Sequence, residues 1–110
     1  MTIGICSVEL YLPGINSLKQ KRSIINSIKT KTRKHFNVSI SEVNYSEKWQ
    51  RSTLGIVGVS NNGKLLESSF KKILNNIHQK RGVEIINYKI EVKNGIQAKK
   101  GEFSYNGDNF

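Results

Sequence analysis

The side chains in this sequence that are best placed to do chemistry are cations, and the chemistry that they could do is to bind anions. The chain has 18 lysine and arginine residues against 8 aspartate and glutamate residues, which gives a formal net charge of +10. Such an excess favours polyanionic partners such as RNA, DNA or an anionic membrane surface. No acidic residue occurs between Glu9 and Glu42, and one predicted helix in that interval carries seven cations: Lys19, Lys21, Arg22, Lys29, Lys31, Arg33 and Lys34.

The spacing of these cations favours anion binding over a plain solvated helix face. Neighbouring like charges such as Lys29 and Arg33 cost about 0.2–0.5 kcal/mol per pair. The helix dipole also disfavours cations in the first turn, where Lys19 and Lys21 fall. A face that serves only solubility normally mixes the two signs of charge. Four positions form one ridge at spacings of i, i+4, i+7 and i+11: Arg22, Asn26, Lys29 and Arg33.

The elements that must position these cations follow from the periodicity of the apolar residues. The first helix opens on a capping box, because Ser17 is followed three residues later by Gln20. The second helix ends at Arg81, with Gly82 as the residue after its C-terminus. The predicted elements are a strand at 3–12, a helix at 17–35, a strand at 37–45, a strand at 50–60, a helix at 64–81 and a strand at 83–92.

Two of the strands carry further predictions. The apolar residues of the 37–45 strand change face between Ile40 and Val43, which indicates a β-bulge. In the 83–92 strand, alternation predicts that every second residue from Ile86 to Val92, including Tyr88 and Ile90, is buried.

The β-α-β-β-α-β order predicts an α+β, ferredoxin-like fold. Two interleaved split β-α-β units with right-handed crossovers give a four-stranded antiparallel sheet with both helices on one face. We expect one domain at 1–92 and a flexible polar tail at 93–110, because the tail has scattered charge, three glycines and no sustained period. The fold leaves the other face of the sheet uncovered, and it does not define a function.

The lengths of these elements predict that cations from three segments gather at one end of the molecule, which we call the basic pole. The stretch "YSEKWQRS" at 45–52 supplies the turn there, and it contains Trp49, the only tryptophan. Trp49 either covers an end of the core, which we favour, or stands outward as a stacking platform. The predicted members of the basic pole are Lys19, Lys21, Arg22, Lys48, Arg51, Lys80 and Arg81.

Three stretches resemble the YlxP-like family of small bacterial proteins of unknown function: "SLKQKR" at 17–22, "FNVSISEVNY" at 36–45 and "WQRSTLGIVGVS" at 49–60. The resemblance covers residues 1–92 and implies a ferredoxin-like fold. Genes of this family commonly lie beside genes for translation initiation and ribosome maturation factors, which implies RNA or the ribosome as a partner. The resemblance supplies no activity and no defined binding residues.

Catalytic and metal chemistry find little support in the sequence. Cys6 is the only cysteine and falls on the predicted core face, where a thiol is neither accessible nor activated. His35 and His78 have no ligand partner at metal spacing. We therefore expect no enzyme, no metal and no cofactor. A lone cysteine, no leader peptide and no apolar run long enough to span a bilayer together predict a cytoplasmic protein without a membrane partner.

Two functions remain after these exclusions. The first is a non-enzymatic RNA- or ribosome-binding accessory protein of the translation and ribosome-maturation context, which grips phosphates with the basic helix and the basic pole. The second is a homo-oligomeric protein-interaction module that uses the open sheet face and Trp49. The residues predicted to bind nucleic acid are Lys19, Lys21, Arg22, Lys29, Arg33, Lys48, Trp49, Arg51, Lys80 and Arg81.

Overall fold

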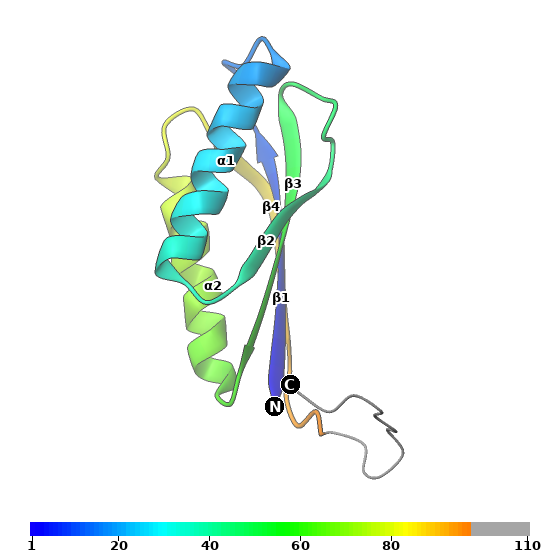
Figure 1. The fold of residues 1–110 in the computed structure, drawn as a ribbon, viewed down its shortest axis with the longest axis vertical. Helices are drawn as coiled ribbons and strands as arrows, with labels where there is room; N and C mark the ends of the chain where they lie inside the picture. The colour runs from blue at the N-terminus through cyan, green and yellow to red at the C-terminus, as the bar shows by residue number, and fades with distance from the viewer. Residues whose placement is uncertain (98–110) are drawn as a thin grey trace, which may run out of the picture.

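The computed structural model describes residues 1–97, and the predicted tail beyond Gln97 lies outside the described residues. One antiparallel sheet has the strand order β2-β3-β1-β4, and both helices cover the same face of it (Figure 1). The predicted ferredoxin-like α+β fold is therefore confirmed. The elements are β1 (Thr2–Tyr11), α1 (Leu18–His35), β2 (Ser39–Asn44), β3 (Arg51–Ser60), α2 (Gly63–His78) and β4 (Glu84–Lys93).

The start of α1 is held by the predicted capping box. The hydroxyl of Ser17 accepts a hydrogen bond from the backbone N–H of Gln20 at 3.2 Å. The side chain of Gln20 returns to the backbone N–H of Asn16 at 3.1 Å, one residue before the position that the standard box uses. Two otherwise unpaired backbone donors are thus satisfied, which fixes the direction in which α1 leaves β1.

The core lies between the sheet and the helices, and two adjacent glycines set how closely α2 approaches the sheet. Gly4 on β1 pairs with Gly58 on β3. A Cβ atom on Gly4 would lie 2.5 Å from Cε2 of Phe70 and 2.7 Å from Cδ2 of Leu66, and one on Gly58 would lie 2.9 Å from Cδ1 of Leu66. The absence of side chains at these two positions lets Phe70 pack with no exposed surface.

Two predicted features of the second half of the chain are wrong. The helix α2 ends at His78 instead of Arg81, because the N–H of Lys80 turns back to the carbonyl of Ile77 and tightens the last turn. Gly82 does have a left-handed φ of 82°, but it serves the turn into β4. The predicted buried set of β4 is also wrong in part, since Ile86 is 51% exposed.

Tyr88, from the same predicted set, is 59% exposed. It lies opposite the buried Val8 and therefore faces the helix layer, but β4 is the edge strand and α2 leaves its outer margin uncovered. The register shifts where Leu10 pairs with Ile85, which displaces Ile86. Alternation thus predicted the correct face for Tyr88, Ile90 and Val92. It did not predict how far Tyr88 is exposed, because no strand among residues 1–97 pairs with the outer edge of β4.

The predicted bulge in β2 is confirmed. The register against β3 shifts between Glu42 and Asn44, and the displaced residue, Val43, is 62% exposed. Before the shift, Glu42 lies opposite Leu54 and therefore faces the helix layer. β2 ends one residue after the bulge, at Asn44, and has six residues in all.

We predict that Gly4→Ala lowers the free energy of unfolding by about 1–3 kcal/mol, because the added methyl forces Phe70 and Leu66 away from the sheet. Gly14→Ala is the matched control, since a Cβ at Gly14 meets no atom within 4 Å. Urea denaturation followed by circular dichroism measures both variants. Equal stability of the two variants would contradict the close approach of α2 to the sheet.

Candidate nucleic-acid interface

The start of α1, the β2–β3 connection and the α2–β4 connection lie at the same end of the molecule, away from the N-terminus (Figure 1). These three segments carry the residues of the basic pole. Of the predicted members, Lys19, Arg22, Lys48 and Arg81 are exposed, Lys80 is half-buried, and Lys21 is buried. The remaining member, Arg51, is also partly covered. The basic pole therefore contains both exposed cations and cations that are wholly or partly buried.

Lys21 belongs to the interior and not to the binding surface that we predicted. Its side chain is 1% exposed, and its Nζ lies 2.9 Å from Oε2 of Glu42. The same Glu42 oxygen accepts a hydrogen bond from the hydroxyl of the fully buried Ser52 at 2.6 Å. A cation that is buried and neutralised in this way cannot reach the phosphate of a partner, so we exclude Lys21 from the candidate interface.

A sequence signal for this buried ion pair exists, although the prediction that Lys21 binds a ligand overlooks it. Lys21 stands four residues before Ile25 and seven before Ile28, on the buried stripe of α1. Glu42 faces this stripe because it lies opposite Leu54 in the sheet. A lysine on the apolar face of a helix requires an acid beneath it, and that requirement could have identified the pair.

Lys21 also holds the connection between β2 and β3. Its Nζ donates a hydrogen bond to the backbone carbonyl of Tyr45. Tyr45 is the one non-glycine residue among residues 1–97 with a positive φ, which is 63°. Residues with a Cβ atom rarely adopt this backbone conformation. The carbonyl of Tyr45 accepts a second hydrogen bond from the N–H of Lys48 at 3.0 Å. These bonds fix the turn that presents Trp49.

Arg51 is the second cation of the pole that already has partners. Its guanidinium forms an ion pair with Glu9, which shares the open sheet face, and it lies over the ring of Tyr45 at 4.4 Å from the centroid. Its Nε is buried without a hydrogen-bond partner. The side chain keeps 43% of its surface exposed, so Arg51 positions the Tyr45 ring while offering only part of its charge to a ligand.

Trp49 does not cover the core, contrary to the interpretation that we favoured. Its side chain is 50% exposed, and it is not part of the hydrophobic core that residues 1–97 form. It borders a shallow surface hollow together with Tyr45, Lys48 and Arg51. Trp49 therefore stands as an exposed aromatic surface among cations, which is the alternative that the sequence left open.

The ridge of α1 is largely available to a ligand. Arg22 is exposed and Lys29 is half-buried. Arg33 is exposed but donates a hydrogen bond from Nη2 to the carbonyl of Ile40 at 2.9 Å, so it also ties the end of α1 to β2.

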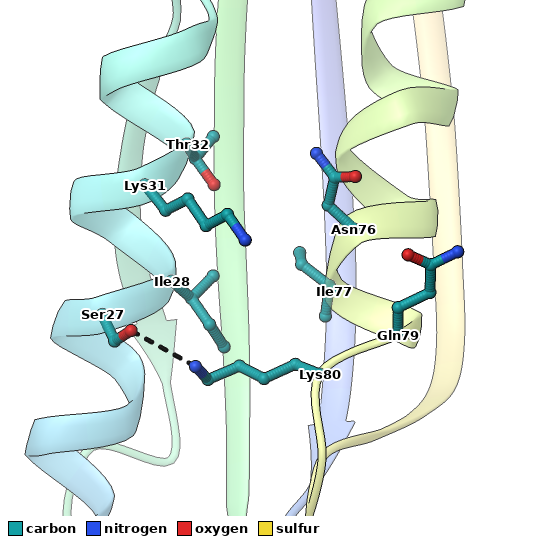
Figure 2. A pocket seen from close by; sticks show the side chains of 8 residues that line it. All are labelled: Ser27, Ile28, Lys31, Thr32, Asn76, Ile77, Gln79 and Lys80. Atoms are coloured by element: carbon teal, nitrogen blue, oxygen red, sulfur yellow. Dashed lines mark hydrogen bonds between the residues drawn. The ribbon is translucent and has the colours of Figure 1, made fainter.

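A groove between the two helices adds a site that sequence reasoning missed. Figure 2 shows the amines of Lys31, on α1, and Lys80, just after α2, pointing into the space between the helices. Lys80 donates a hydrogen bond to the hydroxyl of Ser27 at 3.2 Å. The groove has a volume of about 240 Å³. Its lining consists of Ser27, Ile28, Lys31, Thr32, Asn76, Ile77, Gln79 and Lys80.

The inter-helix groove combines ammonium, amide and hydroxyl donors over an apolar floor of Ile28 and Ile77. Donors of these types suit the oxygens of a phosphate group. Lys31 belonged to the basic run in the sequence, but only the position of α2 shows that its side chain lines the same groove as Lys80. The spacing of residues along α1 could not have identified this pair.

The positive charge of α1 is mostly not balanced by acidic residues. Within residues 1–97, the ion pairs use Lys21, Arg51, Lys71 and Lys89, so Lys21 is the only cation of α1 that has a carboxylate partner. The helix itself carries no acidic residue. The other cations of α1 therefore project a positive potential that nothing on the helix neutralises.

The open sheet face carries a different kind of surface. Ile5, Val57 and Val59 are exposed there by 47%, 43% and 56%, and Ile5 lies directly opposite Val57. Tyr11 on this face is half-buried. The homo-oligomeric module that uses this face stays a prediction.

Within residues 1–97, no group of three or more His, Cys, Asp or Glu side chains could hold a metal ion. Neither of the two helices described is long and apolar enough to cross a membrane. The geometry thus defines a ferredoxin-like α+β domain with a basic helix layer.

The family of the chain follows from comparison with known proteins. The model of the family described as "Protein of unknown function (DUF503)" matches residues 3–90, so the chain belongs to that family. The "Uncharacterized protein YlxP" of Bacillus subtilis (strain 168) is 38% identical over 72 residues, which cover 66% of this chain and 78% of that protein. The resemblance inferred from the sequence is therefore confirmed.

Among solved structures, the chain is similar to LarC2, the C-terminal domain of a cyclometallase involved in the synthesis of the NPN cofactor of lactate racemase, in its apo form. The TM-score is 0.39 and the sequence identity is 9%, with 84% of this chain and 56% of that chain covered. A likeness of this degree carries no argument about function.

We predict that Lys21→Met lowers the free energy of unfolding by about 2–4 kcal/mol, because it leaves Glu42 without its counter-charge beneath α1. Adding Glu42→Gln should recover more than half of that loss, since a neutral amide still accepts the hydrogen bond from Ser52. Lys19→Met, an exposed neighbour, is the matched control and should change stability by less than about 0.5 kcal/mol. Chemical denaturation measures all three variants, and equal effects of Lys21→Met and Lys19→Met would contradict the buried pair.

We predict that the thiol of Cys6 resists alkylation in the native protein at mildly alkaline pH. Burial raises the pKa of this thiol to about 11 and leaves it with no exposed surface, so both the reactive thiolate and access to it are lacking. Mass spectrometry after treatment with iodoacetamide should show modification only in denaturant. Rapid modification of the folded protein would contradict this placement of Cys6.

Proposed function

We propose that the chain is a non-enzymatic RNA-binding protein of the cytoplasm whose helix layer holds phosphate groups, with structured RNA of the ribosome as one form that the partner can take. The observation that carries the proposal is the inter-helix groove. Two ammonium groups from different segments, those of Lys31 and Lys80, line this one groove together with amide and hydroxyl donors (Figure 2). A solvated face whose cations serve only solubility has no reason to bring two like charges from separate elements together.

The cations around the groove extend the proposed contact surface along α1. Arg22 and Lys29 lie on the ridge of the helix, and neither forms an ion pair within residues 1–97. Phosphate contacts of this kind supply sequence-independent affinity and position the nucleic acid. We therefore assign the groove and the ridge to the RNA backbone.

Trp49 supports the choice of single-stranded or unpaired RNA over a regular duplex. Half of its surface is exposed, and the β2–β3 connection to which it belongs lies at the end of the molecule where α1 begins (Figure 1). The guanidinium of Arg51 orders the neighbouring ring of Tyr45. Exposed aromatic rings beside cations stack unpaired bases. A base that stacks on Trp49 would leave its phosphates free to follow the cations of the pole.

The test uses fluorescence anisotropy with a labelled single-stranded RNA. Lys31→Glu combined with Lys80→Glu should weaken binding at least about tenfold at low salt, because two phosphate contacts become repulsions. The wild-type binding constant should fall with salt concentration with a logarithmic slope of about −3, as expected for about four phosphate contacts on a single strand.

The matched control is Lys64→Glu combined with Lys93→Glu, which makes the same total change of charge. Lys64 is the second residue of α2 and Lys93 is the last residue of β4, and both of these element ends lie at the end of the molecule opposite the basic pole (Figure 1). The control should retain most of the affinity. Equal weakening of the two variants would show binding by net charge alone, and absence of binding by the wild type would contradict the proposed function.

A further inference from the structure

The two edges of the sheet differ in a way that bears on assembly. β2 has six residues and a bulge at Val43, and features of this kind protect an edge from pairing with another chain. β4 has ten residues, contains no proline and pairs only with β1 among residues 1–97. After the register shift near Ile86, its pairing with β1 is regular from Asn87 to Lys93. The backbone groups on the outer side of this segment form an open template for another strand.

Exposed apolar groups accompany this open edge. Ile86 and Tyr88 are 51% and 59% exposed, and they line a groove between α2 and β4 of about 560 Å³. The buried Leu74 and the partly buried Ile90 form its inner wall. A strand added at the edge of β4 would therefore cover both unpaired backbone groups and apolar side chains.

The charges of β4 fit a second copy of β4. Lys89 and Glu91 share the open face of the sheet, opposite Ser7 and Ile5 of β1. When two copies of one strand pair antiparallel about a twofold axis, residues that face each other lie on the same side of the sheet. If the axis passes through Ile90, Lys89 faces Glu91 of the second copy on both sides of the axis.

The other registers are less favourable. An axis through Lys89 places the two copies of this lysine opposite each other, and an axis through Glu91 does the same with the two glutamates. Like charges directly opposite each other destabilise a sheet. An axis through Val92 pairs Glu91 with Lys93, but then only residues 91–93 of β4 overlap. The axis through Ile90 pairs the whole regular segment 87–93 with itself.

We propose that the protein forms a homodimer through the edges of β4, with the twofold axis at Ile90. Tyr88 of each copy faces Val92 of the second copy, and Ile90 faces Ile90. The two four-stranded sheets join into one continuous sheet. Because the axis is perpendicular to that sheet, both helix layers lie on the same side of it, and the α2 helices lie nearest the axis. This proposal does not depend on RNA binding.

Sedimentation velocity of the full chain over a dilution series, with nucleic acid removed, tests the proposal. The wild type should dimerise, and Lys89→Glu or Glu91→Lys alone should weaken self-association about tenfold, because each creates two like-charged cross-strand pairs. An equimolar mixture of the two single variants should regain wild-type association as a heterodimer, since every facing pair is again opposite in charge. The double variant Lys89→Glu/Glu91→Lys should associate with itself as the wild type does.

The side chains of Lys89 and Glu91 are exposed in the monomer, so circular dichroism should show that all of the variants fold. Lys64→Glu is the control for a charge change elsewhere on the surface and should leave the dimer intact. A wild type that stays monomeric at all concentrations would overturn the proposal. A dimer that is insensitive to the single reversals would also overturn it and would indicate another surface, such as the open sheet face.

Discussion

The arrangement of this protein depends on one buried ion pair, that between Lys21 and Glu42. It connects the first turns of α1 to β2 on the helix side of the sheet, and through the Tyr45 carbonyl it also fixes the turn between β2 and β3. Desolvation offsets most of the attraction in such a pair, so its main effect is to specify geometry and not to add stability. Together with the hydrogen bonds from the Gln50 side chain to the carbonyls of Pro13 and Ile15, it fixes the start of α1 relative to the β2–β3 connection.

The same pair explains why the cations of this chain differ in role despite their similar appearance in the sequence. Lys21 and Arg51 are neutralised by Glu42 and Glu9 and serve the architecture. Arg22, Lys31 and their neighbours on α1 have no carboxylate partner within residues 1–97. Lys21 and Arg51 thus hold in place the surface that carries the cations without a carboxylate partner. The excess positive charge is concentrated on the helix layer.

The fold could be predicted from the sequence because its determinants are local. The capping box at Ser17, the alternation of β1 and the change of face in β2 each depend on residues that are close together in the chain. The exposure of Tyr88 could not be predicted, because it depends on β4 lying at an edge of the sheet. That Lys31 and Lys80 line one groove depends on how the two helices pack, which no local pattern shows. The buried role of Lys21, in contrast, could have been inferred from its position on the apolar stripe of α1. The sequence therefore predicted the end of the molecule at which the cations gather, but not which of these cations a ligand can reach.

The proposed binding of RNA phosphate groups in the inter-helix groove is tested most directly by lysine footprinting. The folded protein is acetylated with and without a single-stranded RNA, and the modification of each lysine is measured by mass spectrometry. We expect RNA to protect Lys31 and Lys80 strongly while Lys64 and Lys93 react as before. Protection that is equal at all four lysines, or absent at Lys31 and Lys80, would contradict this placement of the RNA.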